Sequence, residues 1–350
     1  MSFGLYEDNK KLINDFGASP IKDIEVPNHY AFTNELVVSH RGFDEFYQAL
    51  KQNKKCAIVS GVNASGTLHL GHKPLFDTLL FFQQEHDVPV FIPISDDESY
   101  VSDKVSTQQE GLSNAKALAR ELIAYGFDTS KTFLIIDQLY TPIYNLAIRF
   151  SKRVTLSEVK ATYGYENSDN PGLFFYPAVQ TAHVLFPLVE RDFDHVLVPI
   201  GPDEDAHLRI ARGIADKEKI RKPSVIHFSF LPGTDGQKMS KSKNNFIKLF
   251  ESPKVVKKLV NKSLSGGQES VEEHRKLGGD ADNDVAFLYL QKMFLSAKES
   301  ATIRTQYESG ELLSGELKGM LVDYLVDMGE RLNTSLAKVS DEDVQEALIK

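Results

Sequence analysis

The chain has 350 residues, 41% hydrophobic and 25% charged, which is the composition of a soluble folded protein of two or three domains. Its basic and acidic residues give a net charge of 40 − 49 = −9, which excludes binding of nucleic acid through a global positive field and leaves only local basic patches. The single cysteine, Cys56, excludes an internal disulfide and a cysteine zinc site. Because we find neither a secretory signal nor an apolar run of about 18 residues, we expect a cytoplasmic protein without a membrane span.

Residues 1–40 are predicted to form an N-terminal extension packed on the next domain. From about residue 41, helical patterns alternate with short apolar runs that are typical of buried parallel strands. Strands are expected at 56–60, 90–94, 133–136, 195–200 and 225–228, and helices at 43–52, 74–85, 107–125, 176–188 and 206–215. This alternation predicts an α/β fold with a doubly wound parallel sheet, a Rossmann-like nucleotide-binding domain. The domain would span 41–250, with an inserted helical segment around 105–190.

The strand pattern stops after about residue 250. Helices are expected at 255–263, 285–294, 315–332 and 341–348, and two glycine pairs mark the entry to this region. We therefore place a domain boundary near 250 and expect residues 251–350 to form an all-helical domain.

The first motif follows the strand expected at 56–60 and runs from Gly61 to His72, with the sequence GVNASGTLHLGH. A glycine-rich turn between a strand and a helix suits phosphate, because backbone N–H groups and the helix dipole converge there. The G-x-G-x-x-G dinucleotide fingerprint is absent, and the P-loop lysine is replaced by Thr67. What remains is His69-x-Gly71-His72, two imidazoles able to donate hydrogen bonds to an α-phosphate, around a glycine that lets a flat base approach closely.

The second motif is Lys238-Met239-Ser240-Lys241-Ser242, on a loop after the last strand. Two lysines and two serines on such a loop suit a leaving group rich in negative charge, such as pyrophosphate. The alternative, a solvated basic loop, is less able to explain this five-letter string.

The two motifs together resemble the H-x-G-H and K-M-S-K-S signatures of the class I aminoacyl-tRNA synthetases, in letters, order and separation. The resemblance implies activation of an amino acid by ATP with Mg²⁺, then transfer to the terminal adenosine of a tRNA. It implies a catalytic role for four residues, His69, His72, Lys238 and Lys241. Contacts to ATP are implied for Gly61, Ser65, Gly66, Gly71, Met239, Ser240 and Ser242.

Further segments are similar to the archaeal and eukaryotic tryptophanyl-tRNA synthetases. They are SDDESY at 95–100, YPAVQTA at 176–182, VPIGPDEDAHLR at 198–209, LSGG at 264–267 and KLGG at 276–279. The resemblance runs from about residue 41 to the end of the chain and implies that L-tryptophan and tRNA(Trp) are the substrates. It also implies a homodimer and makes the helical domain an anticodon-binding one.

The tyrosine enzymes are the nearest alternative within this resemblance. They normally read the phenol hydroxyl with an Asp three residues after the signature Gln180, where this chain has His183. The usual tyrosine ahead of the glycine turn is also missing, and Val59 stands near that place. A buried phenol would lack its partner, which favours an indole.

The chain also departs from the tryptophan enzymes. Those of eukaryotes read the indole N–H with a Tyr near Val59 and a Gln near Pro93, and this chain has neither. The acceptors left are Glu98, Gln180 and His183. In addition, the usual D-Q-D string is D-E-D here, so that Glu204 is either a contact for the substrate ammonium or a first-turn acid stabilised by the helix dipole. The residues predicted to bind the amino acid are therefore Glu98, Gln180, His183, Gly201 and Glu204.

For tRNA, Lys254, Lys257 and Lys258 fall three to four residues apart on one predicted helix face. A solvated surface helix is the alternative for any one of them. A nucleotidyltransferase that shares H-x-G-H is disfavoured by the long helical region. A non-catalytic tRNA-binding paralogue is disfavoured because both signatures are intact, whereas an altered amino-acid specificity stays open.

Overall fold

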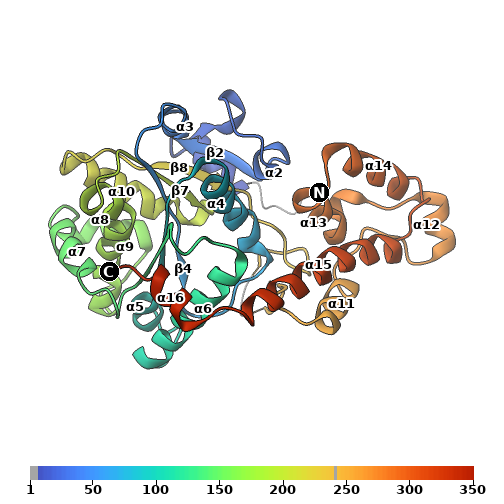
Figure 1. Ribbon diagram of the computed structural model, residues 1–350. Helices are drawn as coiled ribbons and strands as arrows, with labels where there is room; N and C mark the ends of the chain where they lie inside the picture. Colours follow the sequence, from blue (N-terminus) through green and yellow to red (C-terminus); the bar gives the residue numbers. More distant parts are fainter. Residues whose placement is uncertain (1–6, 240–242) are drawn as a thin grey trace.

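The computed structural model describes residues 7–239 and 243–350, and its centre is an eight-stranded sheet in the order β1-β2-β8-β7-β3-β5-β4, with β6 paired to β5 (Figure 1). The strands are β1 (Ser19–Pro20), β2 (Val37–Arg41), β3 (Cys56–Val59), β4 (Val62–Asn63), β5 (Val90–Ser95), β6 (Thr132–Ile136), β7 (His195–Ile200) and β8 (Ser224–Phe228). The pairs formed by β3 to β8 are parallel, and only β1 and β2 run antiparallel to their neighbours.

Helices cover both faces of this sheet. In chain order they are α1 (Glu7–Asn14), α2 (Tyr30–Thr33), α3 (Phe43–Lys51), α4 (Lys73–His86), α5 (Asp96–Val101), α6 (Gln108–Tyr125), α7 (Ile143–Ser151), α8 (Leu156–Tyr163), α9 (Pro171–Glu190) and α10 (Asp205–Lys217). In β3, Ala57 and Val59 pack with residues of α7, α9 and α10, whereas Cys56 and Ile58 pack with those of α3, α4 and α6. Successive residues of a strand point to opposite faces, so a run that is apolar throughout is buried on both. The predicted doubly wound α/β fold is confirmed.

The helical region lies to one side of the sheet (Figure 1). It contains α11 (Pro253–Asn261), α12 (Val271–Leu277), α13 (Val285–Met293), α14 (Ala297–Glu308) and α15 (Ser314–Leu336). The last helix, α16 (Asp341–Ala347), lies against the sheet domain. The long α15 packs on α11 and α13 and also reaches α6. After α15 the chain returns to the sheet, where the Ile349 N–H donates to the Leu134 carbonyl at 3.0 Å.

The structure departs from the predicted domain boundaries at residues 40 and 250. The predicted N-terminal extension supplies β1 and β2, and residue 40 lies inside β2, which pairs with β8. The last residues of the predicted helical domain pack through α16 on α6 and β6 of the nucleotide fold. The segment around 105–190 contains β6 as well as helices.

One helix of the described residues, α9, is long and apolar enough to cross a membrane by length and composition. Its middle, from Pro177 to Pro187 apart from Gln180, is buried against the sheet and its neighbouring helices, as in the core helix of a globular domain.

Candidate active site

The two signature motifs meet at the carboxyl edge of the parallel strands. Backbone hydrogen bonds join the first motif to the segment after the second, since Leu70 N–H donates to Ile247 O at 2.9 Å and Leu249 N–H donates to Leu68 O at 3.0 Å. Sδ of Met239 lies only 3.1 Å from the place where a Cβ on Gly71 would stand. The motifs therefore flank one site, as the nucleotide interpretation requires.

Both signature histidines are oriented by the backbone of their own turn, the 3₁₀ segment Leu70–His72. Gly71 N–H donates to Nδ1 of His69, and His69 N–H donates to Nδ1 of His72, each at 3.1 Å. An imidazole that accepts at Nδ1 carries its proton on Nε2 when it is neutral. In this tautomer Nε2–H of each ring is a hydrogen-bond donor suited to an oxygen such as that of a phosphate. The ring centres are 3.9 Å apart.

Of the second motif, Lys238 and Met239 belong to the described residues. Nζ of Lys238 lies 3.1 Å from Oδ2 of Asp203 and 4.0 Å from the centre of the Phe230 ring. Asn245 fixes the base of the loop, because its Nδ2 donates to Asp235 at 2.7 Å and to the Lys238 carbonyl at 3.1 Å. The predicted Ser240, Lys241 and Ser242 lie outside the described residues.

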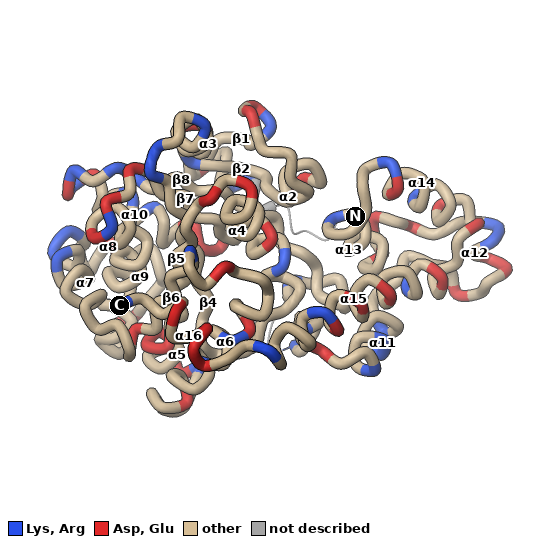
Figure 2. The backbone as a smooth tube through the Cα atoms, in the orientation of Figure 1, with Lys and Arg blue, Asp and Glu red and all other residues tan. Residues whose placement is uncertain are grey.

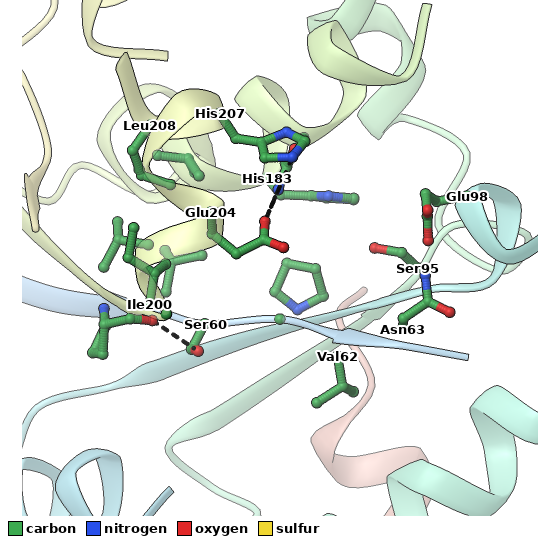
Figure 3. A pocket seen from close by; sticks show the side chains of 18 of the residues that line it. Ser60, Val62, Asn63, Ser95, Glu98, His183, Ile200, Glu204, His207 and Leu208 are labelled. Carbon is green, nitrogen blue, oxygen red and sulfur yellow. Dashed lines mark hydrogen bonds and ion pairs between the residues drawn. The ribbon is translucent and has the colours of Figure 1, made fainter. Parts of the chain in front are cut away.

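Beside these motifs a cavity of about 330 Å³ opens between β3, β5, β7 and α9 (Figure 3). Apolar side chains make much of its wall: Val59, Leu75, Pro93, Val184, Val198 and Ile200. The predicted amino-acid-binding residues all line it: Glu98, Gln180, His183, Gly201 and Glu204. Gly61 and His72 line it as well, whereas Ser65 and Gly66 lie in the turn between β4 and Leu70–His72. An apolar wall with a few convergent polar groups is the usual form of a small-molecule site.

Two acids and an amide make the polar end of the cavity. Glu98 pairs with Lys104 at 2.6 Å, and Nε2 of Gln180 donates to Oε2 of Glu204 at 3.3 Å. Oε1 of Gln180 is buried and has no hydrogen-bond partner among the described residues. A buried amide oxygen without a donor is costly, so this atom marks a place where a bound donor fits.

Glu204 directly precedes α10, at its N-cap position, but its side chain makes no capping hydrogen bond there. The carboxylate turns to the cavity, where it meets Gln180 and lies 3.6 Å from Nε2 of His207 (Figure 3). Burial, with a further contribution from the neighbouring charge of Asp203, raises the pKa of Glu204 to about 7. Of the two interpretations left open, the geometry favours a substrate contact over a helix cap.

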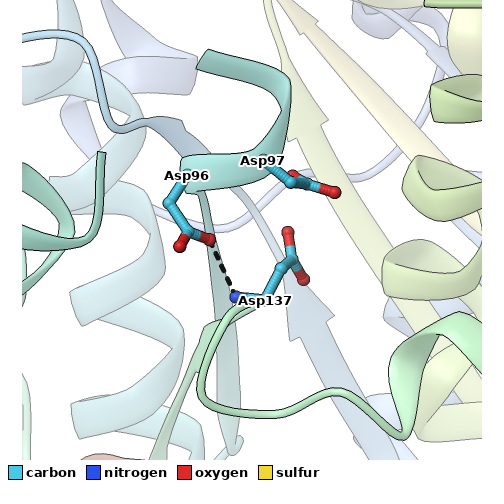
Figure 4. A group of neighbouring side chains, drawn as sticks. All are labelled: Asp96, Asp97 and Asp137. Carbon is cyan, nitrogen blue, oxygen red and sulfur yellow. Dashed lines mark hydrogen bonds between the residues drawn. The ribbon is translucent and has the colours of Figure 1, made fainter. Parts of the chain in front are cut away.

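Val59 and Pro93 line the cavity without offering a side-chain donor or acceptor. The two positions at which the sequence departs from the eukaryotic tryptophan enzymes therefore lie in the cavity wall. Beneath the same wall lie three carboxyl groups that come from α5 and the end of β6: Asp96, Asp97 and Asp137 (Figure 4).

Asp137 was missed in the sequence analysis. It directly follows β6, at the strand edge where the signature motifs lie, and that position is the signal that would have found it. It is fully buried, and its Oδ1 accepts a 2.7 Å hydrogen bond from Nε2 of His183. Asp96 is engaged on both oxygens, by Asp137 N–H at 3.0 Å and by Gln138 Nε2 at 2.6 Å. Asp96 and Asp137 are thus held by donors within the protein, and we assign no Mg²⁺ to the three acids.

The predicted tRNA-binding lysines lie elsewhere, on α11 of the helical region (Figure 2). Lys254, Lys257 and Lys258 are exposed, while Val256 and Val260 of the same helix are buried. The lysines therefore occupy the solvent face of an amphipathic helix, which is compatible with either interpretation of them.

Comparison with known proteins identifies the family. A model described as tRNA synthetases class I (W and Y) matches residues 51–328. The chain is 36% identical over 340 residues to a tryptophan–tRNA ligase of Methanocaldococcus jannaschii, covering 93% of this chain and 92% of that protein. It is 38% identical over 329 residues to tryptophan–tRNA ligase 2 of Halobacterium salinarum, covering 91% and 85%. A crystal structure of Plasmodium falciparum tryptophanyl-tRNA synthetase matches with a TM-score of 0.87 at 29% identity, over 97% of this chain and 94% of that one. The chain belongs to the class I tRNA synthetases, within the family of the tryptophan–tRNA ligases.

Proposed function

We propose that this chain activates L-tryptophan with ATP, releases pyrophosphate, and transfers the tryptophanyl group to the 3′-terminal adenosine of tRNA(Trp). The observation that supports the proposal is the closeness of Gly71 to Met239, together with a cavity beside them that is lined by Gly61, His72 and apolar and acidic side chains. A flat apolar side chain with an ammonium group is the ligand that such walls suit.

The chemistry needs no general base, because the attacking carboxylate is already ionised at neutral pH. The obstacles are the approach of two anions and the charge on the departing pyrophosphate, so positioning and fixed positive charge supply the rate. Nε2–H of His69 and of His72 donates to oxygens of the α-phosphate, and Gly71 leaves room for the adenine. Lys238 leaves Asp203 to hold the β- and γ-phosphates; on sequence grounds Lys241, Ser240 and Ser242 join it.

Mg²⁺ enters this scheme with ATP and neutralises part of the triphosphate charge when bound. The acids within reach of the cavity are engaged by Lys104, Gln180 or His183, so we assign no residue of this chain as its ligand.

The substrate ammonium is placed at the polar end of the cavity. Oε1 of Gln180 needs a donor, and the ionised Glu204 beside it supplies the opposite charge. Glu98, although paired with Lys104, closes the same end. The carboxylate of tryptophan then faces the two signatures.

Lys254, Lys257 and Lys258 bind tRNA phosphates, with residues 251–350 serving mainly as an anticodon-binding domain. The family further supports a homodimer in the cytoplasm, which we include in the proposal. Related tryptophan–tRNA ligases of rat, yeast and human are themselves named cytoplasmic.

The test is ATP–pyrophosphate exchange with each of the twenty amino acids, followed by charging of tRNA(Trp). We expect exchange with tryptophan alone. Exchange with tyrosine would give the tyrosine alternative, and exchange with none would favour a non-catalytic paralogue. Sedimentation of the purified chain tests the dimer separately.

A further inference from the structure

We infer that His183 sets the amino-acid specificity of this site, because its Nδ1 accepts a hydrogen bond from the indole N–H of the substrate. Asp137 positions the His183 ring by accepting a hydrogen bond from its Nε2–H. The inference rests on the proposed function, since it names how the same cavity reads its substrate. His183 would take the place of the tyrosine and glutamine that contact the indole N–H in eukaryotic tryptophan enzymes, because Val59 and Pro93 have no side-chain acceptor.

The tautomer of His183 follows from its partner. Nε2 lies 2.7 Å from Oδ1 of Asp137, in a place where both side chains are buried. A carboxylate oxygen accepts, so Nε2 carries the proton and Nδ1 keeps its lone pair. Burial lowers the pKa of His183 to about 4, so the ring stays neutral at physiological pH and Nδ1 stays an acceptor.

Nδ1 is the nitrogen open to the ligand. His183 lines the cavity, its hydrogen bond to Asp137 uses Nε2, and within the described residues no group donates a hydrogen bond to Nδ1. Unlike Oε1 of Gln180, Nδ1 of His183 is not completely buried. Figure 3 shows His183 above the cavity, between Glu204 and Glu98.

The spacing on α9 fits a tryptophan that spans both groups. Gln180 and His183 are three residues apart, on one face of the helix and separated by about 4.5 Å of rise. With the ammonium at Gln180, the side chain extends along α9 toward His183 and Val184.

Asp97 is the third side chain in this arrangement, next to His183 and Asp137. Its carboxyl group faces Asp137 (Figure 4), whose Oδ2 has no donor among the described side chains. One proton shared between the two groups satisfies this oxygen and leaves a single negative charge beside the imidazole. Burial raises the pKa of Asp97 to about 8 and that of Asp137 to about 7, which agrees with a retained proton.

The experiment measures kcat/KM in pyrophosphate exchange for tryptophan and for its benzothienyl analogue, in which sulfur replaces the indole N–H. We expect the wild-type enzyme to prefer tryptophan at least tenfold, as a site built for an N–H should. His183→Gln keeps a donor for Asp137, since its Nε2 can take the place of the imidazole Nε2, but leaves no acceptor where Nδ1 stood. It should lower kcat/KM for tryptophan about ten- to a hundredfold, bring the ratio near one, and leave the KM for ATP unchanged.

A second variant at the same position should keep part of the preference for tryptophan. His183→Asn keeps an amide oxygen near the position of Nδ1 but is too short for Asp137, so it should retain more of the preference than His183→Gln. The opposite order, with His183→Gln at the wild-type ratio, would show that His183 is only a structural partner of Asp137. Tyr144→Phe is the matched control: it removes the 3.2 Å hydrogen bond to Asp97 without touching His183, and should keep the ratio.

A measurement on the unmodified enzyme does not depend on the folding of any variant. The ¹⁵N NMR shifts of His183 at pH 7 should report a proton on Nε2, and tryptophan, but not the analogue, should shift Nδ1. A proton on Nδ1 would overturn the inference. A wild-type enzyme that exchanges pyrophosphate with no amino acid refutes the proposed function instead, whereas one that activates tryptophan with no preference over the analogue refutes only this inference.

Discussion

Asp205 of α10 accepts two parallel hydrogen bonds from Arg41 of β2, at 2.8 Å from Nε and 2.9 Å from the second guanidinium nitrogen. The same carboxylate accepts a 3.0 Å hydrogen bond from Nε2 of His227 in β8. Asp205 thus ties the N-terminal strand to the helix that carries Glu204. The side chains of Asp205 and His227 are buried, and that of Arg41 nearly so.

We expect Asp205→Ala to lower the free energy of unfolding by about 3–5 kcal/mol, because it leaves the Arg41 charge uncompensated. Burial opposes ionisation of Asp205, but His227 and Arg41 outweigh it and hold the pKa of this carboxyl well below its usual range. The stabilisation is therefore full above the unfolded-state pKa of about 3.9 and lost as pH falls through the folded value. Urea unfolding at pH 7 and at pH 3 measures both effects. Asp216→Ala, which removes an exposed pair with Lys222, should leave the free energy of unfolding close to that of the wild type.

Gly71→Ala tests the close approach of the two signatures. A Cβ there would lie 2.9 Å from Cε1 of His69 and 3.1 Å from Sδ of Met239, so the His69 imidazole must shift from its position. We expect the KM for ATP to rise at least tenfold while tryptophan binding stays within twofold. Gly213→Ala is the control, since nothing lies within 4 Å of its Cβ position and the change should stabilise the helix by up to about 1 kcal/mol. Unchanged ATP kinetics in Gly71→Ala would refute the role of this contact.

Lys238→Ala should lower the rate of pyrophosphate exchange by about a hundredfold, because a charge that stabilises the departing pyrophosphate is lost. The Kd for tryptophan, measured by fluorescence quenching or calorimetry, should not change. Lys243→Ala is a matched control on the same loop, since Lys243 is exposed and contacts only Gln237 among the interactions described. Exchange that survives Lys238→Ala at the wild-type rate would contradict the assignment.

The raised pKa of Glu204, about 7, predicts a pH dependence of tryptophan use. Below pH 7 the carboxyl group gains a proton and loses the charge that attracts the ammonium. The kcat/KM for tryptophan should therefore fall by up to about tenfold per pH unit once the pH is well below 7. Glu204→Gln should be less active at pH 8 and should lose this dependence, with the KM for ATP as the internal control. An identical profile in the variant would exclude Glu204 as the titrating group.

Replacing Lys254, Lys257 and Lys258 together by Ala should raise the KM for tRNA without changing pyrophosphate exchange. Each lost phosphate contact should reduce the slope of log affinity against log salt by about one unit. Lys298→Ala, an exposed lysine of α14, serves as the control. A salt slope equal to that of the wild-type chain would mean that α11 is only a solvated surface helix.

The sequence by itself determined the family, the order of the main strands and helices, and several polar groups of the cavity wall. It could do so because buried parallel strands are apolar throughout, as in Val90–Ile94, and because each signature is contiguous along the chain. Glu98, Gln180 and Glu204 were found for the same reason, since each lies in a local segment at the end of a strand or on the central helix.

Only the tertiary structure decided which partner each of these groups meets. β2 was not predicted because Val-Val-Ser-His-Arg becomes a strand only by pairing with β8, some 190 residues away in the chain. His183 and Asp137 are 46 residues apart and carry no joint sequence signal, so the imidazole tautomer that makes Nδ1 an acceptor arises solely from their contact in the fold.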